Sequence, residues 1–260
     1  MTVRTVKERL RMTERSALVT GASRGIGFAI AKALVAEGYA LTLVSRTGAN
    51  LADAAERLAG HGVRIVTRPA NVADDADLSA VVDLHQQEFG TLDVLVNNAG
   101  MGINAPLSVL DRRQVDLQIA LNLRSVISLT RLAQPMLEKA ALASGRALVV
   151  NVASISGKVG APGLSVYAAA KHGVVGFTDS MNRELYSTGI RFTALCPGFV
   201  DTALSDYVKD QLKAADMVQP ADLAEAVRFL LRLSPACLIP EMLFLEAASL
   251  GIVPTVGGQQ

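Results

Sequence analysis

The sequence predicts one α/β domain in which a doubly wound, seven-stranded parallel sheet is flanked by helices. Short apolar runs rich in β-branched residues alternate along the chain with longer segments of helical period, which is the pattern of parallel strands joined by crossover helices. A glycine-rich turn directly follows the first apolar run. The chain has 260 residues and is 50% hydrophobic, enough for one large core.

The expected elements follow one another in regular order. Seven runs are predicted to be strands: residues 17–20, 40–45, 63–68, 94–96, 147–151, 191–196 and 242–245. Six segments between them are predicted to be helices: residues 25–37, 50–59, 74–88, 111–139, 166–187 and 220–233. Residues 198–219 show no clear period, and a loop of that length in a compact domain is typical of a lid or binding loop. We expect the domain to span residues 15–246, between a flexible tail at 1–14 and a second tail at 247–260.

Composition excludes several classes of function. The 25 Lys and Arg residues nearly balance 24 Asp and Glu, without a long run of one sign, so neither nucleic acid nor an anionic membrane is expected as a partner. No apolar stretch reaches the ~20 residues of a membrane-spanning helix. Residues 1–11 lack the apolar run of a secretory signal, and Met12 is an alternative start, so we expect a cytoplasmic protein. Cys196 and Cys237 are too few for a disulfide framework or a zinc site, and no metal is expected.

The glycine turn at residues 20–27, TGASRGIG, predicts a phosphate-binding site. Gly21, Gly25 and Gly27 stand between a predicted strand and a predicted helix, so the free N–H groups and the positive end of the helix dipole face the turn. The spacing differs from the G-x-G-x-x-G of other dinucleotide folds. The alternative is a tight turn that serves only close packing of helix and strand.

A second motif places a phenol and an ammonium one helical turn apart. Tyr167 and Lys171 are at positions i and i+4, so in a helix they share one face. An ammonium stabilises the phenolate form of a neighbouring tyrosine, which makes the phenol a usable acid and base near neutral pH. A surface pair with no chemical role is the alternative.

These two motifs and three others resemble the short-chain dehydrogenase/reductase family over residues 15–235. The others are NNAG at 97–100, PGFVDT at 197–202, and a serine, Ser154, thirteen residues before Tyr167. The front two-thirds are most similar to 3-oxoacyl-(acyl carrier protein) reductases and related carbonyl reductases. The resemblance implies a Rossmann-like fold and an enzyme that reduces a carbonyl to an alcohol, or the reverse, by hydride transfer.

The resemblance also implies roles for individual residues. Ser154 would bind the substrate oxygen, Tyr167 would be the general acid, and Lys171 would act on both Tyr167 and the nicotinamide ribose, with Asn122 as the fourth catalytic residue. The implied cofactor-binding residues are Gly21, Ser23, Arg24, Gly25, Ile26, Gly27, Ser45, Arg46, Asn71, Val72, Asn98, Ala99, Gly100, Tyr167, Lys171, Pro197, Gly198, Val200 and Thr202.

The predicted cofactor is NADP(H). In this fold a carboxylate at the end of the second strand accepts a hydrogen bond from the ribose 2′-OH, whereas arginine accommodates a 2′-phosphate. Here the strand ends in Ser45 and Arg46 without an acidic residue, and Arg24 projects from the glycine turn toward the same region. Alternatively, both arginines are ordinary surface charges. Asn71 replaces the family's aspartate beside adenine and keeps an acceptor oxygen.

The substrate is expected to be a small carbonyl compound or alcohol in a mostly apolar pocket formed by residues 101–105, 155–163 and 202–218. Residues 235–242 depart from the family's usual closing segment, which leaves acyl-carrier substrates and other ketones or aldehydes equally open. The resemblance implies a homodimer or homotetramer paired through residues 111–139 and 166–187. A non-catalytic NADP(H)-sensing protein, and an isomerase or dehydratase on the same scaffold, are the competing functions.

Overall fold

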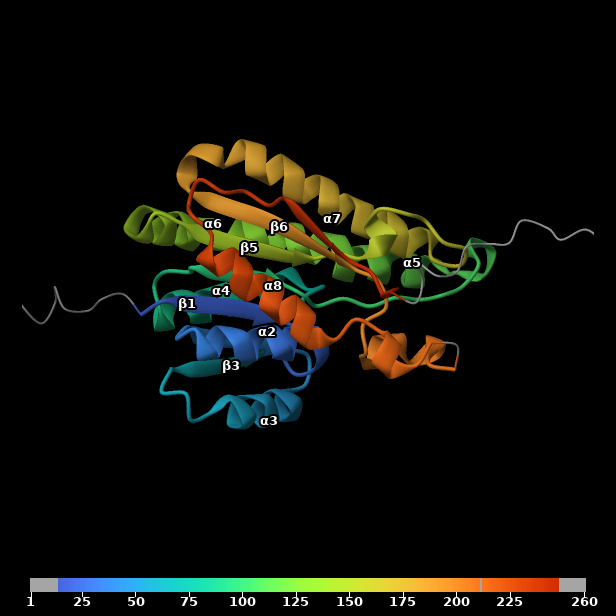
Figure 1. The fold of residues 1–260 in the computed structure, drawn as a ribbon, viewed down its shortest axis with the longest axis horizontal. Coiled ribbons are helices and arrows are strands. Elements are labelled where there is room, and N and C mark those ends of the chain that lie inside the picture. Colours follow the sequence, from blue (N-terminus) through green and yellow to red (C-terminus); the bar gives the residue numbers. More distant parts are fainter. Residues whose placement is uncertain (1–13, 211, 248–260) are drawn as a thin grey trace, which may run out of the picture.

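The structure, a computed structural model, describes residues 14–210 and 212–247. Within these ranges it forms the expected α/β domain (Figure 1). The predicted tails at 1–14 and 247–260, and the alternative start at Met12, lie almost wholly outside the described residues. No helix in the described ranges is long and apolar enough to span a membrane, and no cluster of metal-ligating side chains occurs there.

Seven parallel strands form one sheet, as predicted. They are β1 (Ser16–Thr20), β2 (Ala40–Ser45), β3 (Ile65–Pro69), β4 (Val94–Asn97), β5 (Ala147–Val152), β6 (Ile190–Pro197) and β7 (Glu241–Phe244). Their order in the sheet is β3-β2-β1-β4-β5-β6-β7, and every neighbouring pair is parallel. The order reverses between β1 and β4, and ligands of open α/β sheets bind outside the carboxyl ends of the strands at such a reversal.

Helices cover both faces of the sheet (Figure 1). The longer ones are α2 (Gly25–Ala36), α3 (Gly48–Leu58), α4 (Asp75–Glu88), α5 (Arg112–Ile119), α6 (Ser125–Ser144), α7 (Ser165–Glu184) and α8 (Pro220–Arg232). One buried cluster joins α2, α3 and α8 to the sheet through side chains such as Leu34, Leu51 and Val227. A second joins α4, α6 and α7 through Leu78, Leu129 and others on the opposite face. Because both faces are covered, β1 is buried at all five positions.

The helix predicted at residues 111–139 differs from the observed one. The observed helix consists of α5, a π-helical turn η2 (Ala120–Arg124) and α6, and it continues to Ser144. Such π-turns are rare and often mark functional sites. The turn contains Asn122, whose side chain hydrogen-bonds the backbone of Met101, outside this helix, as well as the Gln118 carbonyl within it.

The segment at residues 198–219 is not structureless. It holds two short 3-10 helices, η5 (Ala203–Val208) and η6 (Ala214–Asp216), and a parallel bridge between Val200 and Val218 closes its two ends. Lys209 lies within 3.1 Å of the Asp201 carboxylate and 2.8 Å of the Asp206 carboxylate. The segment is therefore a folded cover over the carboxyl edge of the sheet.

A buried histidine joins β1, β2 and α4. His85 is fully buried; its Nδ1 lies 2.8 Å from the Thr42 hydroxyl and its Nε2 lies 3.0 Å from the Thr91 carbonyl oxygen. A neutral ring with its hydrogen on Nε2 donates to Thr91 and accepts from Thr42, so both ring nitrogens are satisfied. Burial lowers the pKa of His85 to about 4, against a smaller opposite effect of the Thr91 hydrogen bond.

We expect His85 to make the protein sensitive to acid. Between pH 6.5 and 4 the unfolded chain binds a proton that the folded protein excludes, so the free energy of unfolding falls as pH falls through this window, by about 3 kcal/mol. Urea unfolding at pH 7, 5.5 and 4.5 measures the change. His85→Gln, which does not titrate, should show a pH slope smaller by about one proton. Equal slopes in the two proteins would contradict the assignment.

Candidate active site

Two adjoining hollows lie at the carboxyl edge of the sheet, and Leu204 of η5 lines both. One is a groove of about 590 Å³ lined by Gly21, Ser23, Arg24, Gly25, Ile26, Ser45, Arg46, Thr47, Asn50, Ala70, Val72, Asn98, Ala99, Gly100, Met101, Leu121, Asp201, Thr202, Ala203 and Leu204. The other is a cavity of about 540 Å³ lined by Gly102, Asn104, Ser154, Ile155, Ser156, Val159, Gly160, Ala161, Leu164, Tyr167, Gly198, Phe199, Leu204 and Ser205.

The glycine turn is tied to the loop after β4, across the point where the strand order reverses. The Thr20 hydroxyl oxygen accepts the N–H groups of Asn98 and Ala99, each at 3.0 Å. The Asn98 side-chain amide donates back to the carbonyl oxygens of Thr20 and Gly21, at 2.9 and 3.2 Å. These bonds fix the wall of the groove between β1 and β4.

Gly27 lies behind the groove and packs against this tie. A Cβ atom at Gly27 would lie 2.3 Å from the Gly21 carbonyl oxygen and 2.5 Å from Nδ2 of Asn98, distances that real Cβ atoms do not adopt. The start of α2 approaches β1 this closely only because residue 27 has no side chain.

Gly27→Ala is therefore expected to displace α2 and lower the free energy of unfolding by about 3 kcal/mol, with at least about a hundredfold loss of nucleotide affinity. Thermal unfolding and titration with NADPH measure both effects. The matched control is Gly176→Ala in α7, where the added methyl meets nothing within 4 Å and stability should rise slightly. Unchanged affinity in Gly27→Ala would contradict the close-approach argument.

The groove offers groups that suit an extended, anionic dinucleotide. Arg24 is the N-cap of α2 and its side chain does not cap the helix, so the first N–H groups of α2 remain for a ligand. Arg24 and Arg46 are both exposed, and within the described part of the chain neither is paired with a carboxylate. Thr202 and the Asn98–Gly100 backbone line the groove farther along. Cations, backbone donors and small polar groups thus follow one another along the groove.

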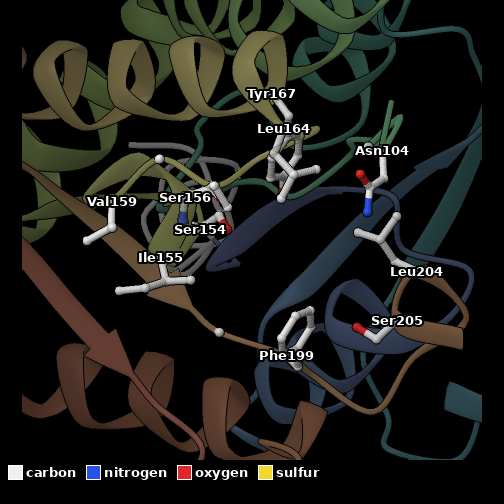
Figure 2. Close-up of a pocket in the computed structure, with 14 residues that line it drawn as sticks. Asn104, Ser154, Ile155, Ser156, Val159, Leu164, Tyr167, Phe199, Leu204 and Ser205 are labelled. Carbon is white, nitrogen blue, oxygen red and sulfur yellow. Dashed lines mark hydrogen bonds between the residues drawn. The ribbon is translucent and has the colours of Figure 1, made fainter. Parts of the chain in front are cut away.

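The cavity is lined by mostly apolar side chains together with four hydroxyl-bearing residues, Ser154, Ser156, Tyr167 and Ser205. Figure 2 shows Ser154 on one side with Ile155 and Val159, while Tyr167 and Leu164 project from above. Ser154 is the N-cap of the short 3-10 helix η3 (Ile155–Gly157), and its oxygen accepts the Ser156 N–H at 3.1 Å. The hydrogen of the Ser154 hydroxyl can therefore be donated to a ligand in the cavity.

Lys171 lies behind Tyr167, one turn later in α7. Its side chain is 4% exposed, its ammonium donates to the Val152 carbonyl at the end of β5 at 2.8 Å, and Nζ lies 5.7 Å from the Tyr167 ring centroid. Burial lowers the pKa of Lys171 to about 8, with a smaller opposite effect from Cys196. The lysine thus retains its charge at neutral pH and remains titratable just above it.

Asn122 connects the π-turn to the loop after β4. Its Oδ1 accepts the Met101 N–H at 3.0 Å, while its Nδ2 donates to the Met101 carbonyl at 2.8 Å and to the Gln118 carbonyl at 2.9 Å. Gly100 lies between Asn122 and Lys171, since a Cβ there would be 2.7 Å from Asn122 Oδ1 and 3.7 Å from Lys171 Nζ. The four residues expected to be catalytic are therefore gathered around this corner of the sheet.

The remaining site residues expected from sequence are divided between the two hollows. Gly198 lines the cavity instead of the groove. Pro197, Val200 and Asn71 line neither hollow. The Asn71 oxygen accepts the Ala73 N–H at 3.2 Å, which orders the loop after β3, while the neighbouring Ala70 and Val72 line the groove. Sequence reasoning missed the structural roles of Thr20 and Gln118, because both depend on partners far along the chain.

Comparisons with known proteins show the family of the chain. The family model described as short chain dehydrogenase matches residues 15–213. The chain is 38% identical over 230 residues to the 3-oxoacyl-(acyl-carrier-protein) reductase FabG of Staphylococcus aureus, covering 85% of this chain and 92% of the relative. It is 40% identical over 195 residues to a putative ketoacyl reductase of granaticin polyketide synthase from Streptomyces violaceoruber, covering 75% and 71% of the two chains.

Solved structures show the same fold. An alcohol dehydrogenase from the archaeon Thermococcus sibiricus, complexed with 5-hydroxy-NADP, has a TM-score of 0.82 at 29% identity and covers 90% of this chain and 97% of its own. An actinorhodin polyketide ketoreductase with NADPH has a TM-score of 0.81 at 31% identity and covers 92% and 98%. The protein therefore belongs to the short-chain dehydrogenase/reductase family of oxidoreductases.

Proposed function

We propose that the protein is an NADP(H)-dependent carbonyl reductase that uses Ser154, Tyr167, Lys171 and Asn122. The observation that carries this proposal is that a mostly apolar cavity containing the Ser154 and Tyr167 hydroxyls adjoins a groove suited to a dinucleotide. A ketone in the cavity would lie beside the groove, under the cover formed by η5. When bound, the reduced nicotinamide supplies the hydride that a carbonyl carbon accepts.

The side chains have separate roles at the carbonyl oxygen of the substrate. Ser154 donates a hydrogen bond to it and orients it, because its own oxygen is already used to accept the Ser156 N–H. Tyr167 delivers a proton to it as general acid. The positive charge of Lys171 stabilises the phenolate that remains, and the low polarity around this buried ammonium strengthens the effect. Asn122 holds the Met101 backbone, and so fixes the wall next to Lys171.

The preference for NADP(H) rests on Arg24 and Arg46. A 2′-phosphate carries two negative charges at most, and arginine binds such groups through several parallel hydrogen bonds. β2 ends at Ser45, next to Arg46 and without a carboxylate that could bind a ribose 2′-OH. The two similar structures described above were solved with 5-hydroxy-NADP and with NADPH, although a Brucella melitensis reductase of comparable similarity is complexed with NADH.

The substrate class is a ketone or aldehyde with substantial apolar surface. The cavity is lined by Ile155, Val159, Leu164, Phe199 and Leu204. The names of related proteins cover ketoacyl reductases, a D-beta-hydroxybutyrate dehydrogenase and a levodione reductase, so the substrates named among relatives are varied. A panel of ketones, aldehydes and acyl thioesters, followed by the loss of NADPH absorbance, tests the proposal. It fails if no member of the panel consumes NADPH.

The same panel separates the competing functions. A sensing protein would bind NADPH and consume none with any substrate. An isomerase or dehydratase would convert its substrate without net loss of NADPH, which product analysis detects. The Ser154 hydroxyl and the Tyr167 phenol in one cavity, with the Lys171 ammonium behind the phenol, favour the reductase over a sensor, since together they form a proton donor that binding of the cofactor alone would not need.

We further propose a cytoplasmic homodimer or homotetramer. Leu117 on α5 and Ile127 on α6 are 42% and 40% exposed, and apolar side chains on these helices suit a contact with a second copy. Sedimentation of the purified protein at several concentrations measures the oligomeric state.

A further inference from the structure

Gln118, in the last turn of α5, is a buried amide of which only the oxygen has a hydrogen-bond partner among the described residues. Its side chain is fully buried, and its Oε1 accepts the Ile103 N–H at 3.1 Å. Its Nε2 has no hydrogen-bond partner among the described residues. A buried N–H group without a partner is destabilising, and an apolar side chain of the same size would avoid that cost. The benefit of glutamine at this position must therefore come from its oxygen, which holds Ile103.

Ile103 belongs to the segment at residues 101–105, which leaves β4 and forms one wall of the cavity through Gly102 and Asn104. Asn122, one helical turn after Gln118, holds Met101 at both its N–H and its carbonyl group. Asn122 also donates to the Gln118 carbonyl, which links the two amides. Side chains four residues apart on one helix thus hold the backbone on either side of Gly102.

Gly102 in turn faces the ring of Tyr167. A Cβ atom built on Gly102 would lie 3.8 Å from Cδ2 and 3.9 Å from Cε2 of that ring, so the space between the Gly102 backbone and the ring is about the size of one methyl group. Figure 2 shows Tyr167 entering the cavity from above, while Asn104 of the same segment lies to one side. The position of the Gly102 backbone therefore limits where the Tyr167 ring can go.

We propose that Gln118 is a positioning residue for catalysis, which acts on Tyr167 through Ile103 and Gly102. This inference rests on the proposed role of Tyr167 as general acid. Proton transfer requires the phenol to stay within hydrogen-bond reach of the substrate oxygen, and a misplacement of about 1 Å can cost up to about a hundredfold in rate. Asn122 fixes the segment on one side of Gly102, and Gln118 fixes it on the other.

Two substitutions distinguish the effect of the Gln118 acceptor oxygen from the effect of the side-chain volume. Gln118→Met keeps the volume but removes the acceptor, and we expect kcat to fall about tenfold while KM for NADPH stays within about twofold. Thermal stability should change little, because the unpartnered Nε2 is removed together with the Ile103 hydrogen bond. Gln118→Glu keeps an oxygen acceptor and, assayed at pH 6, where a buried carboxyl group is protonated, should recover at least about half of wild-type kcat.

A readout independent of turnover is hydrogen exchange of the backbone at residues 101–105 in the protein without cofactor. Exchange should be faster in Gln118→Met and close to wild type in Gln118→Glu. If the methionine variant does not fold, Gln118→Leu removes the same acceptor and replaces it in both measurements.

The matched control is Asn182→Leu. Asn182 is another buried amide that holds a backbone, accepting from the Phe192 N–H and donating to the Phe192 carbonyl, both at 2.8 Å. It lies fifteen residues beyond Tyr167 in α7, about 22 Å along the helix. Its replacement should lower the melting temperature and leave kcat unchanged.

The proposal is overturned if Gln118→Met keeps wild-type kcat, or if it loses activity only in proportion to lost stability, as a purely structural residue would. It is also overturned if exchange at residues 101–105 is unaffected. Failure of the proposed function is distinguishable from these outcomes, because it is observed in the wild-type protein as the absence of NADPH consumption.

Discussion

Replacing Tyr167 with phenylalanine is expected to lower kcat for carbonyl reduction by about 10³-fold while the affinity for NADPH changes less than about threefold. The substitution removes only the hydroxyl group, so the ring still faces Gly102 and keeps its contact with the Lys171 ammonium. What is lost is the proton donor. Single-turnover measurement of NADPH oxidation, together with a fluorescence titration of NADPH, separates the chemical step from binding.

The control for Tyr167→Phe is Tyr186→Phe. Tyr186 is 72% exposed and lies beyond the end of α7, in the 3-10 helix η4 (Tyr186–Thr188), so the same chemical change there should leave kcat unaltered. Substantial turnover in Tyr167→Phe would show that another group protonates the substrate, and the proposed mechanism would then be wrong.

Arg46→Asp is expected to reverse the cofactor preference. The change removes a guanidinium from the groove and adds a carboxylate, which repels a 2′-phosphate and accepts a hydrogen bond from a ribose 2′-OH. Each of the two effects is worth about 1.5–3 kcal/mol, so the ratio of kcat/KM for NADPH to that for NADH should fall by roughly 10²–10⁴-fold. Steady-state kinetics with both cofactors measures this ratio.

The control for the change in charge is Arg57→Asp. Arg57 lies on α3, outside the residues that line the groove, and its guanidinium stacks over the Phe28 ring at 4.1 Å. The same reversal of charge at this position should leave the ratio nearly unchanged, because exposed charges that do not touch the ligand are screened by salt. A wild-type enzyme that uses NADH and NADPH equally well would contradict the assignment of Arg24 and Arg46.

Elements with a strong local pattern were predicted well from the sequence. The apolar run that became β1 is buried at every position, and such runs identify interior parallel strands without knowledge of their partners. The sequence predicted helix at residues 111–139 but neither its continuation to Ser144 nor its π-turn, because a change of hydrogen-bond register leaves little trace in apolar periodicity. The segment at 198–219 was expected to be a loop, and its 3-10 helices and closing bridge depend on contacts between its distant ends.

In the candidate site, too, some features were predicted from the sequence and others were decided by contacts between distant segments. The glycine turn and the segments after β4 and β6 were expected to share one cofactor site because the family resemblance implies it. In the structure all three follow parallel strands, whose carboxyl ends lie on one edge. The sequence could not predict that Gly198 lines the cavity while Thr202 lines the groove, since this depends on how the chain turns after β6. Gln118 carries no sequence signal at all: it stands in a helix and resembles any solvent-facing polar residue.

By itself, then, the sequence determined the family and the succession of strands and helices along the chain, because both follow from local patterns and from motif positions. Only the tertiary structure decided that Lys171 is buried, with its pKa lowered to about 8. It also decided that Asn122 and Gln118 hold backbone groups 21 and 15 residues earlier. Burial and long-range hydrogen bonds depend on which distant segments meet, and no local pattern records that.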